Sequence, residues 1–296
     1  MKGLSRVLCA VDIGEPGLAA FEQALALARV HAAKLIVVYA VPRSQSFNTG
    51  ATERVAYLLN LRAAAEAAGV DVRVDVQHGE AAGIILLHAR ARQPDLIVLS
   101  AAHGNGANGL RVGSVVEDVL RGATCPTLVV GRHHELSPLR PLRNVLCAVD
   151  FSPSSDAAVE RALSLVAERE ARLTLLHVVY GPEEGSGWRS MRMHTDGYYR
   201  HVAGEALQRL QSLIPSSGEG TVLARVVVGR VAPEIVRTAR ASEADLVIVG
   251  TQSRSRLGRW MFGVTGQLLQ EAPCPVLAVP TRTPHVRERD EWRPAA

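Results

Sequence analysis

The chain has 296 residues, 47% of them hydrophobic, and a formal net charge of +4. This length is typical of about two domains, each long enough to build its own core. No apolar run approaches the ~20 residues of a membrane span, and no secretory signal is present, so we expect a soluble cytoplasmic protein. The basic residues, which are arginines apart from Lys2 and Lys34, are scattered among acids, and this disfavours nucleic-acid binding. The small number of lysines excludes a P-loop, because a P-loop needs a lysine that reaches the β- and γ-phosphates.

The sequence contains an internal duplication. Residues 7–12 and residues 145–150 both read Val-Leu-Cys-Ala-Val-Asp. An apolar run closed by a carboxylate is typical of a buried parallel strand whose last residue emerges from the sheet. Because the correspondence continues through both halves, we predict an N-terminal copy at residues 1–135, a C-terminal copy at 140–281 and a disordered tail at 282–296.

Apolar runs and helical periodicities alternate in each copy as β-α-β-α-β-α-β-α-β. This order predicts an α/β fold in which one parallel sheet is covered by helices on both faces. Valines alternate with polar residues over 70–76, which predicts a strand near a sheet edge. The C-terminal copy has an insertion of about 12 residues at 181–196, which could be a floppy loop or a lid, and its next helix is expected from about Tyr198. The expected strands are 7–12, 35–41, 70–76, 96–99 and 126–130, then 144–149, 173–179, 221–228, 246–249 and 276–279.

A ligand crevice is expected in each copy. Doubly wound sheets bind ligands at the carboxyl ends of their strands, where the strand order reverses. If the first strand is central and the fourth lies beside it, the crevice lies between Asp12 and Ser100 in the N-terminal copy. In the C-terminal copy it lies between Asp150 and Gly250. The loop that follows feeds a helix N-terminus, whose free N–H groups and dipole favour an anion.

Several short motifs together resemble the universal stress protein family. They are Ala-Val-Asp-Phe-Ser-Pro at 148–153, Leu-Thr-Leu-Leu-His-Val at 173–178, Gly-Thr at 250–251 and Ala-Pro-Cys-Pro-Val-Leu at 272–277. The resemblance implies two tandem Rossmann-like, adenine-nucleotide α-hydrolase-like domains, each with a five-stranded parallel sheet of order 3-2-1-4-5. It also implies a role in stress response and pairing of the two copies through their last strands, with a homodimer as a further assembly.

The resemblance implies ATP as ligand, with Mg²⁺ accompanying it. ATP-binding members carry G-x-x-G, nine residues and then G-[S/T] for phosphates and ribose. An Asp after the first strand and a Val in the second strand hold the ribose and adenine side. Carried over by position, the C-terminal copy has Ala148, Val149, Asp150, Val178, Gly250, Ser253, Arg254, Gly263 and Val264, and the N-terminal copy has Asp12, Ala40, Ser100, His103, Gly113 and Ser114.

Each copy holds only part of this motif. Ser253 and Val264 replace a glycine and a hydroxyl residue in the C-terminal copy, whereas Ser100 and His103 replace two glycines in the N-terminal copy. Arginines 254, 256 and 259, which we place in the loop after the fourth strand, suit phosphate oxygens, so the C-terminal copy is the favoured nucleotide site. The alternative is that Asp12 and Asp150 are ordered carboxylates without a ligand.

Three classes of function follow. The leading one is a stress-response protein that binds an adenine nucleotide; the second is a nucleotide-independent scaffold or dimerisation protein with degenerate sites. An enzyme, at most a slow ATP hydrolase, is disfavoured because no general base is recognisable. His177 is expected to be packed rather than catalytic. No metal site is expected, because His103 has no partner at ligand spacing and the four cysteines read as buried hydrophobes.

Overall fold

The computed structural model describes residues 3–43, 50–101, 113–131, 142–167, 171–181, 192–215, 221–251 and 259–281, with the backbone alone for 192–196 and 259–263. The N-terminal copy forms β1 (Arg6–Val11), α1 (Glu15–His31), β2 (Lys34–Val41), α2 (Ala51–Ala67), β3 (Val72–His78), α3 (Ala81–Arg92), β4 (Leu96–Ser100), α4 (Ser114–Gly122) and β5 (Thr127–Val130). The C-terminal copy forms β6 (Asn144–Ala148), α5 (Pro153–Val166), β7 (Arg172–Tyr180), α6 (Arg192–Ser212), β8 (Thr221–Gly229), α7 (Val231–Ala241), β9 (Leu246–Thr251), α8 (Arg259–Glu271) and β10 (Val276–Pro280). The predicted tail lies outside the described residues.

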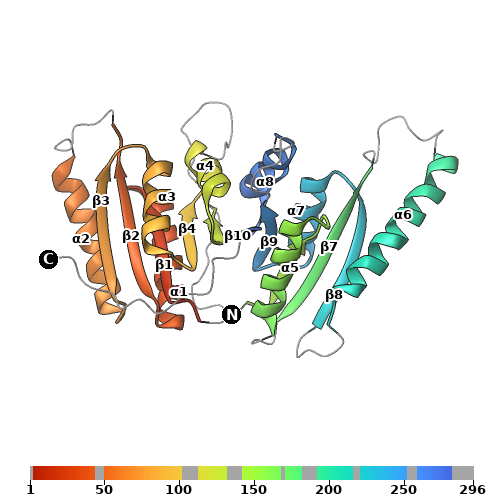
Figure 1. The fold of residues 1–296 in the computed structure, drawn as a ribbon, viewed down its shortest axis with the longest axis horizontal. Coiled ribbons are helices and arrows are strands. Elements are labelled where there is room, and N and C mark those ends of the chain that lie inside the picture. Colours follow the sequence, from red (N-terminus) through yellow and green to blue (C-terminus); the bar gives the residue numbers. More distant parts are fainter. Residues whose placement is uncertain are drawn as a thin grey trace.

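The strands of the described residues form one continuous ten-stranded sheet, in the order β3-β2-β1-β4-β5-β10-β9-β6-β7-β8 (Figure 1). Each half therefore has the predicted order 3-2-1-4-5, and β3 occupies the predicted edge. Neighbouring strands within each half are parallel, whereas β5 and β10 pair antiparallel, with Leu128 opposite Leu277. The predicted pairing of the two copies through their last strands is confirmed.

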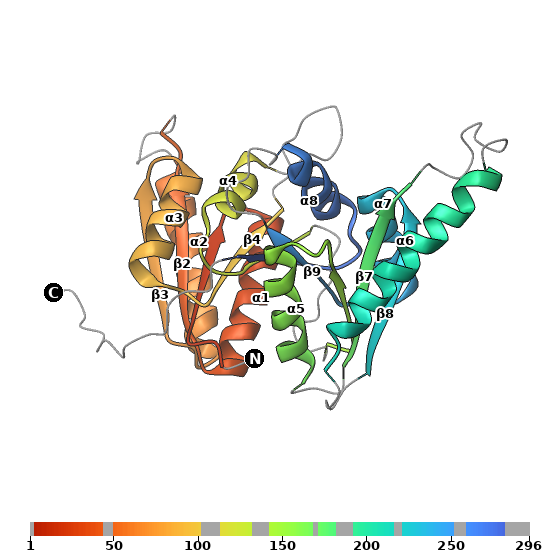
Figure 2. The same cartoon turned by 45° about the vertical axis from the view of Figure 1, so that its right-hand side comes forward.

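The helices divide between the two faces of this sheet. Buried residues of α1, α2, α5 and α6 share one apolar layer, and those of α3, α4, α7 and α8 share the other. Figure 2 shows α6 in front of β7 and β8, with α7 behind them.

The apolar layers of the two copies are continuous with each other. At the seam, Leu128 and Leu277 belong to one layer and Val129 and Val276 to the other, so each layer runs through both copies. The β5–β10 pairing joins the two sheets, and side chains that alternate along a strand continue both apolar faces across the junction.

Most helix ends follow the local sequence. Glu80 caps α3 by accepting hydrogen bonds from Ala82 N and Gly83 N, and Pro153 occupies the first turn of α5. Two expected starts are wrong. Helix α6 begins at Arg192, so the end of the predicted insertion is already helical, and α8 begins at Arg259, a residue that the sequence places in the preceding loop. Residues 192–196 and 259–262 contain neither Gly nor Pro, so nothing local stops either helix from extending towards its N-terminus.

Candidate functional site

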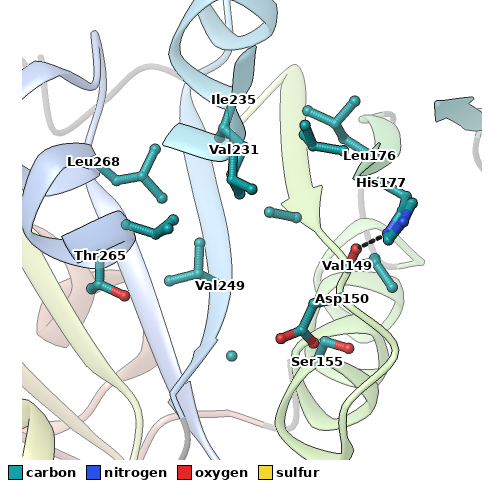
Figure 3. Close-up of a pocket in the computed structure, with 14 residues that line it drawn as sticks. Val149, Asp150, Ser155, Leu176, His177, Val231, Ile235, Val249, Thr265 and Leu268 are labelled. Atoms are coloured by element: carbon teal, nitrogen blue, oxygen red, sulfur yellow. Dashed lines mark hydrogen bonds between the residues drawn. The ribbon is translucent and has the colours of Figure 1, made fainter. Parts of the chain in front are cut away.

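A pocket with a cavity volume of about 240 Å³ opens at the carboxyl ends of the C-terminal strands (Figure 3). Three neighbouring strands form its floor, and α7 and α8 form two of its walls. Most of the lining is apolar, with a few polar groups from β6, α5 and α8. The lining residues are Ala148, Val149, Asp150, Ser155, Leu176, His177, Val178, Val231, Ile235, Val249, Gly250, Val264, Thr265 and Leu268.

Strand register explains why residues so far apart in sequence meet here. Ala148 of β6 lies opposite Leu176 of β7 on one side and Val249 of β9 on the other. The residues that follow each of these, among them Asp150, Val178 and Gly250, therefore emerge at the same edge of the sheet. The crevice expected between Asp150 and Gly250 is present.

Gly250 allows β9 to pass close to the first turn of α5. A Cβ atom at this position would lie 2.4 Å from the carbonyl carbon of Ser154 and 2.6 Å from the backbone nitrogen of Ser155. Both are main-chain atoms, which cannot move aside as a side chain can. The glycine is thus required for packing beside the pocket.

Asp150 is oriented by the residues that cap α5. Its Oδ1 accepts hydrogen bonds from the backbone nitrogen of Ser152 (2.9 Å) and from Ser152 Oγ (2.5 Å). Ser152 Oγ also lies 2.9 Å from Ser154 Oγ and accepts from the backbone nitrogen of Ser155. Among the described residues, both hydrogen bonds to Asp150 are made to Oδ1, which leaves Oδ2 for a ligand.

A stack of side chains supports the turn after Asp150. Phe151 has a φ of +61°, unusual for a residue with a side chain, and its ring centroid lies 4.7 Å from that of His177. The guanidinium of Arg209, on α6, lies 4.2 Å from the centroid of Phe151. Since the carbonyl oxygen of Val149 can only accept, His177 Nδ1 carries a proton and donates it over 2.7 Å. His177 is therefore a packed residue with one edge at the pocket.

The early start of α8 changes which backbone N–H groups are free at the N-terminus of this helix. The first four N–H groups of a helix have no intrahelical partner, and in α8 all of them precede residue 262. Gly263 lies inside the helix, in its second turn. Arg259 is in the first turn instead of the preceding loop. The lining residues Val264 and Thr265 follow within the helix.

The N-terminal copy differs at the equivalent positions. Gly17 stands where the C-terminal copy has Ser155, and a Cβ there would lie only 2.4 Å from Asp12 Oδ1. The Asp12 carboxylate therefore lies directly over the first turn of α1. Tyr39, only 9% exposed, replaces His177, and the buried Ser100 ends β4. Helix α4 begins at Ser114 with Gly113 as its N-cap.

A buried polar group lies behind Tyr39. Arg54 of α2 is only 3% exposed, and its charge acts on the Tyr39 hydroxyl. Burial, with a smaller effect of the Asp12 carboxylate, raises the pKa of Tyr57 to about 12. The side chains that flank the two second strands have thus diverged: tyrosines and an arginine here, and the Phe151–His177–Arg209 stack in the C-terminal copy.

The structure therefore gathers part of the predicted site. Ala148, Val149, Asp150, Val178, Gly250 and Val264 line one pocket, whereas His103, Ser253 and Arg254 lie outside the described residues. Sequence reasoning missed two polar residues, Ser155 and Thr265, and most of the apolar wall. For Ser155 and Thr265 the only signal in the sequence was their position: Ser155 follows the turn at Asp150, and Thr265 follows Val264. The missed wall residues are Leu176, Val231, Ile235, Val249 and Leu268.

Neither a metal cluster nor a membrane segment is found where the structure describes the chain. In the described ranges, no three His, Cys, Asp or Glu residues are placed to share a metal ion. Over the same ranges, no helix combines the length and apolarity needed to span a bilayer. Burial raises the pKa of the thiols of Cys9, Cys147 and Cys274, which fits their reading as small buried hydrophobes.

Fold and site together define a tandem pair of Rossmann-like domains with a pocket in the C-terminal copy. The chain belongs to the universal stress protein family, whose sequence pattern matches residues 3–131 and 141–280. Universal stress protein Rv2623 of Mycobacterium tuberculosis is 28% identical over 199 residues, which cover 67% of this chain and 65% of that protein. Universal stress protein A homolog 1 of Coxiella burnetii is 27% identical over 143 residues, 46% of this chain and 95% of that protein.

Solved structures show the same fold over nearly the whole chain. A universal stress protein from Archaeoglobus fulgidus superposes with a TM-score of 0.67 at 18% identity, covering 93% of this chain and 98% of that one. A putative universal stress protein from Pseudomonas aeruginosa gives a TM-score of 0.59 at 18% identity, with 94% of each chain covered. The tandem arrangement is therefore shared with other proteins.

Proposed function

We propose that this tandem universal stress protein binds an adenine nucleotide in the pocket of its C-terminal copy and serves in stress response through that binding. The observation that carries the proposal is the apolar slot between Leu176, Val178 and Ile235 with the Asp150 carboxylate at its mouth. Apolar walls with a few placed polar groups are typical of small-molecule sites. A planar base suits the slot, and ribose hydroxyls suit the carboxylate.

The size of the pocket supports a ligand that is only partly enclosed. Its volume of about 240 Å³ lies below the roughly 300–1,000 Å³ of sites that enclose a drug-sized ligand. The base and ribose would therefore occupy it, with any phosphates outside. One universal stress protein has been solved in complex with cAMP. Its likeness to this chain is limited to 43% of the residues, so we base the ligand class on the pocket itself.

The N-terminal copy fits the scaffold function better. Its Asp12 carboxylate lies against α1 at Gly17, and its last strand, β5, pairs with β10. We assign it a supporting role, in which it completes the sheet beside the binding copy. A homodimer remains a proposal from the family resemblance.

Isothermal titration of AMP and of ATP with Mg²⁺ tests the binding. The wild type and Asp12→Ala should take up one ligand per chain with equal affinity, whereas Asp150→Ala should lose about 1.5–3 kcal/mol of binding free energy, typical of a hydrogen bond to a charged group. Urea unfolding of each variant checks that the fold is retained. Unchanged binding in Asp150→Ala, or loss in Asp12→Ala, would reject the assignment. Mass spectrometry of ligand extracted from the purified protein identifies what it binds in the cell.

A further inference from the structure

We propose that the β8 edge of the sheet is a self-association surface, at which β8 of a second copy of this chain pairs antiparallel and closes a two-fold dimer. The proposal goes beyond the binding function and does not depend on it. It follows from the position of β8, from the side chains along its edge and from the contrast with the corresponding strand of the N-terminal copy.

Strand β8 ends the ten-stranded sheet at the margin opposite β3 (Figure 1). It pairs with β7 on one side, and among the described residues no strand lies on its other side. An edge strand presents backbone N–H and C=O groups that can pair with a strand of another chain. The nine residues of β8 span about 30 Å, which is longer than most strands in globular proteins.

Large apolar side chains are exposed on both faces of this edge. The row on the α7 side consists of Leu223, Arg225 and Val227, with Tyr180 of β7 beside its end. Leu223 is 48% exposed and Tyr180 is 72% exposed. On the α6 side, Val228 is 40% exposed. Pairing with a further strand would remove part of this apolar surface from water, which favours association.

The duplication supplies a matched comparison. In the N-terminal copy the corresponding row of β3 is Arg73, Asp75 and Gln77, and Pro42 directly follows β2 where Tyr180 ends β7. Arg73 Nε lies 2.8 Å from Asp75 Oδ1. Charged residues and prolines at an edge are means by which proteins prevent unwanted strand pairing. The β3 edge is thus protected, whereas the β8 edge carries leucine, valine and tyrosine at the same places.

A second β8 suits this edge better than a β3 from another chain. Pairing β8 with β3 leaves a free β3 and a free β8 at the two ends, so the assembly would grow without closing. Antiparallel pairing of β8 with β8 closes a two-fold dimer, and both outer edges of that dimer are the protected β3. The chain already contains a junction of this kind, because β5 and β10 join its two copies by antiparallel pairing.

Arg225 restricts the register of this pairing. It is the one charged residue of β8, and a two-fold axis at Arg225 would place the two guanidinium groups directly opposite each other, which is destabilising. Directly paired residues point to the same face, so the axis passes through a residue and not between two residues. We therefore expect the axis at Ala224 or at Val226, which sets Arg225 opposite Leu223 or Val227.

Sedimentation velocity of the full chain without nucleotide tests the dimer. At about 100 µM we expect a species of twice the 31.7 kDa mass of one chain. Leu223→Lys adds a charge to the exposed row and should weaken dimerisation about tenfold or more. Leu87→Lys is the matched control, because Leu87 of α3 is 53% exposed and lies away from β8, and it should leave dimerisation unchanged. Urea unfolding checks that both variants are folded. A monomeric wild type, or a dimer that Leu223→Lys does not weaken, would overturn the proposal.

Cysteine variants test the strand pairing itself. The four natural cysteines are buried, so an introduced cysteine at the edge is the accessible one. With a short bismaleimide, Ala224→Cys and Val226→Cys should give a cross-linked dimer. Val76→Cys, at the position of β3 that corresponds to 226, should remain a single chain. Cross-linking at neither β8 position, or equal cross-linking at β3 and β8, would overturn the proposal.

Discussion

Gly250→Ala should destabilise the protein and damage the pocket together. The added methyl would lie 2.4 Å from the carbonyl carbon and 2.5 Å from the carbonyl oxygen of Ser154. Carbon atoms in proteins pack at roughly 3.5–4.0 Å, so β9 and the start of α5 must separate by about 1 Å. Because the obstacle is backbone, we expect a cost near the upper end of the 1–3 kcal/mol typical of overpacking, about 3 kcal/mol.

Urea unfolding and thermal denaturation measure this cost. A loss of about 3 kcal/mol corresponds to a fall in Tm of about 5 °C in a chain of this length. Ser100→Ala is the matched control: position 100 in the N-terminal copy already carries a Cβ atom, so it should change stability by less than about 1 kcal/mol. Gly250→Ala as stable as wild type, with AMP binding intact, would refute the close approach of β9 to α5.

Three further outcomes are expected. Ser152→Ala removes the N-cap of α5 and the hydrogen bond from the hydroxyl to Asp150. It should lower the free energy of unfolding in urea by about 1 kcal/mol and weaken AMP binding. An unchanged affinity would show that Asp150 is oriented by other groups. Arg209→Ala removes the contact over Phe151 and should cost about 0.5–1 kcal/mol, whereas no change would mean that the stack adds no stability. Burial raises the pKa of Tyr57 from 10.0 to about 12, so its contribution to stability is complete below pH 10 and is lost as the pH rises towards 12. The stability of Tyr57→Phe should fall less over that interval, and parallel curves for the two proteins would contradict the raised pKa.

The duplication made most of the fold predictable. Two identical strands ending in Asp12 and Asp150, and the same alternation after each, led to the strand order that the structure shows. The continuous core was not predictable from length, because it depends on the pairing of β5 with β10. The apolar sequences of β5 and β10 are compatible both with pairing within the chain and with a position at a sheet edge.

The site was only partly predictable. Asp150, Val178 and Gly250 were found from motif and position, because parallel strands bring their ends together. The walls formed by Val231 and Ile235 carry the same apolar pattern as core residues, so periodicity could not distinguish a pocket wall from the interior. The start of α8 could not be predicted, because residues 259–262 contain neither Gly nor Pro to mark a boundary. The position of this start determines which backbone N–H groups of the helix are free.

A crystal structure of the full chain grown with AMP is the most direct test of the central claim. We expect density for one AMP per chain, with its base between Val178 and Ile235 and its ribose hydroxyls on Asp150 Oδ2. AMP bound instead beside Asp12 and Ser100, or a pocket closed by side chains at saturating AMP, would contradict the assignment of the binding site to the C-terminal copy.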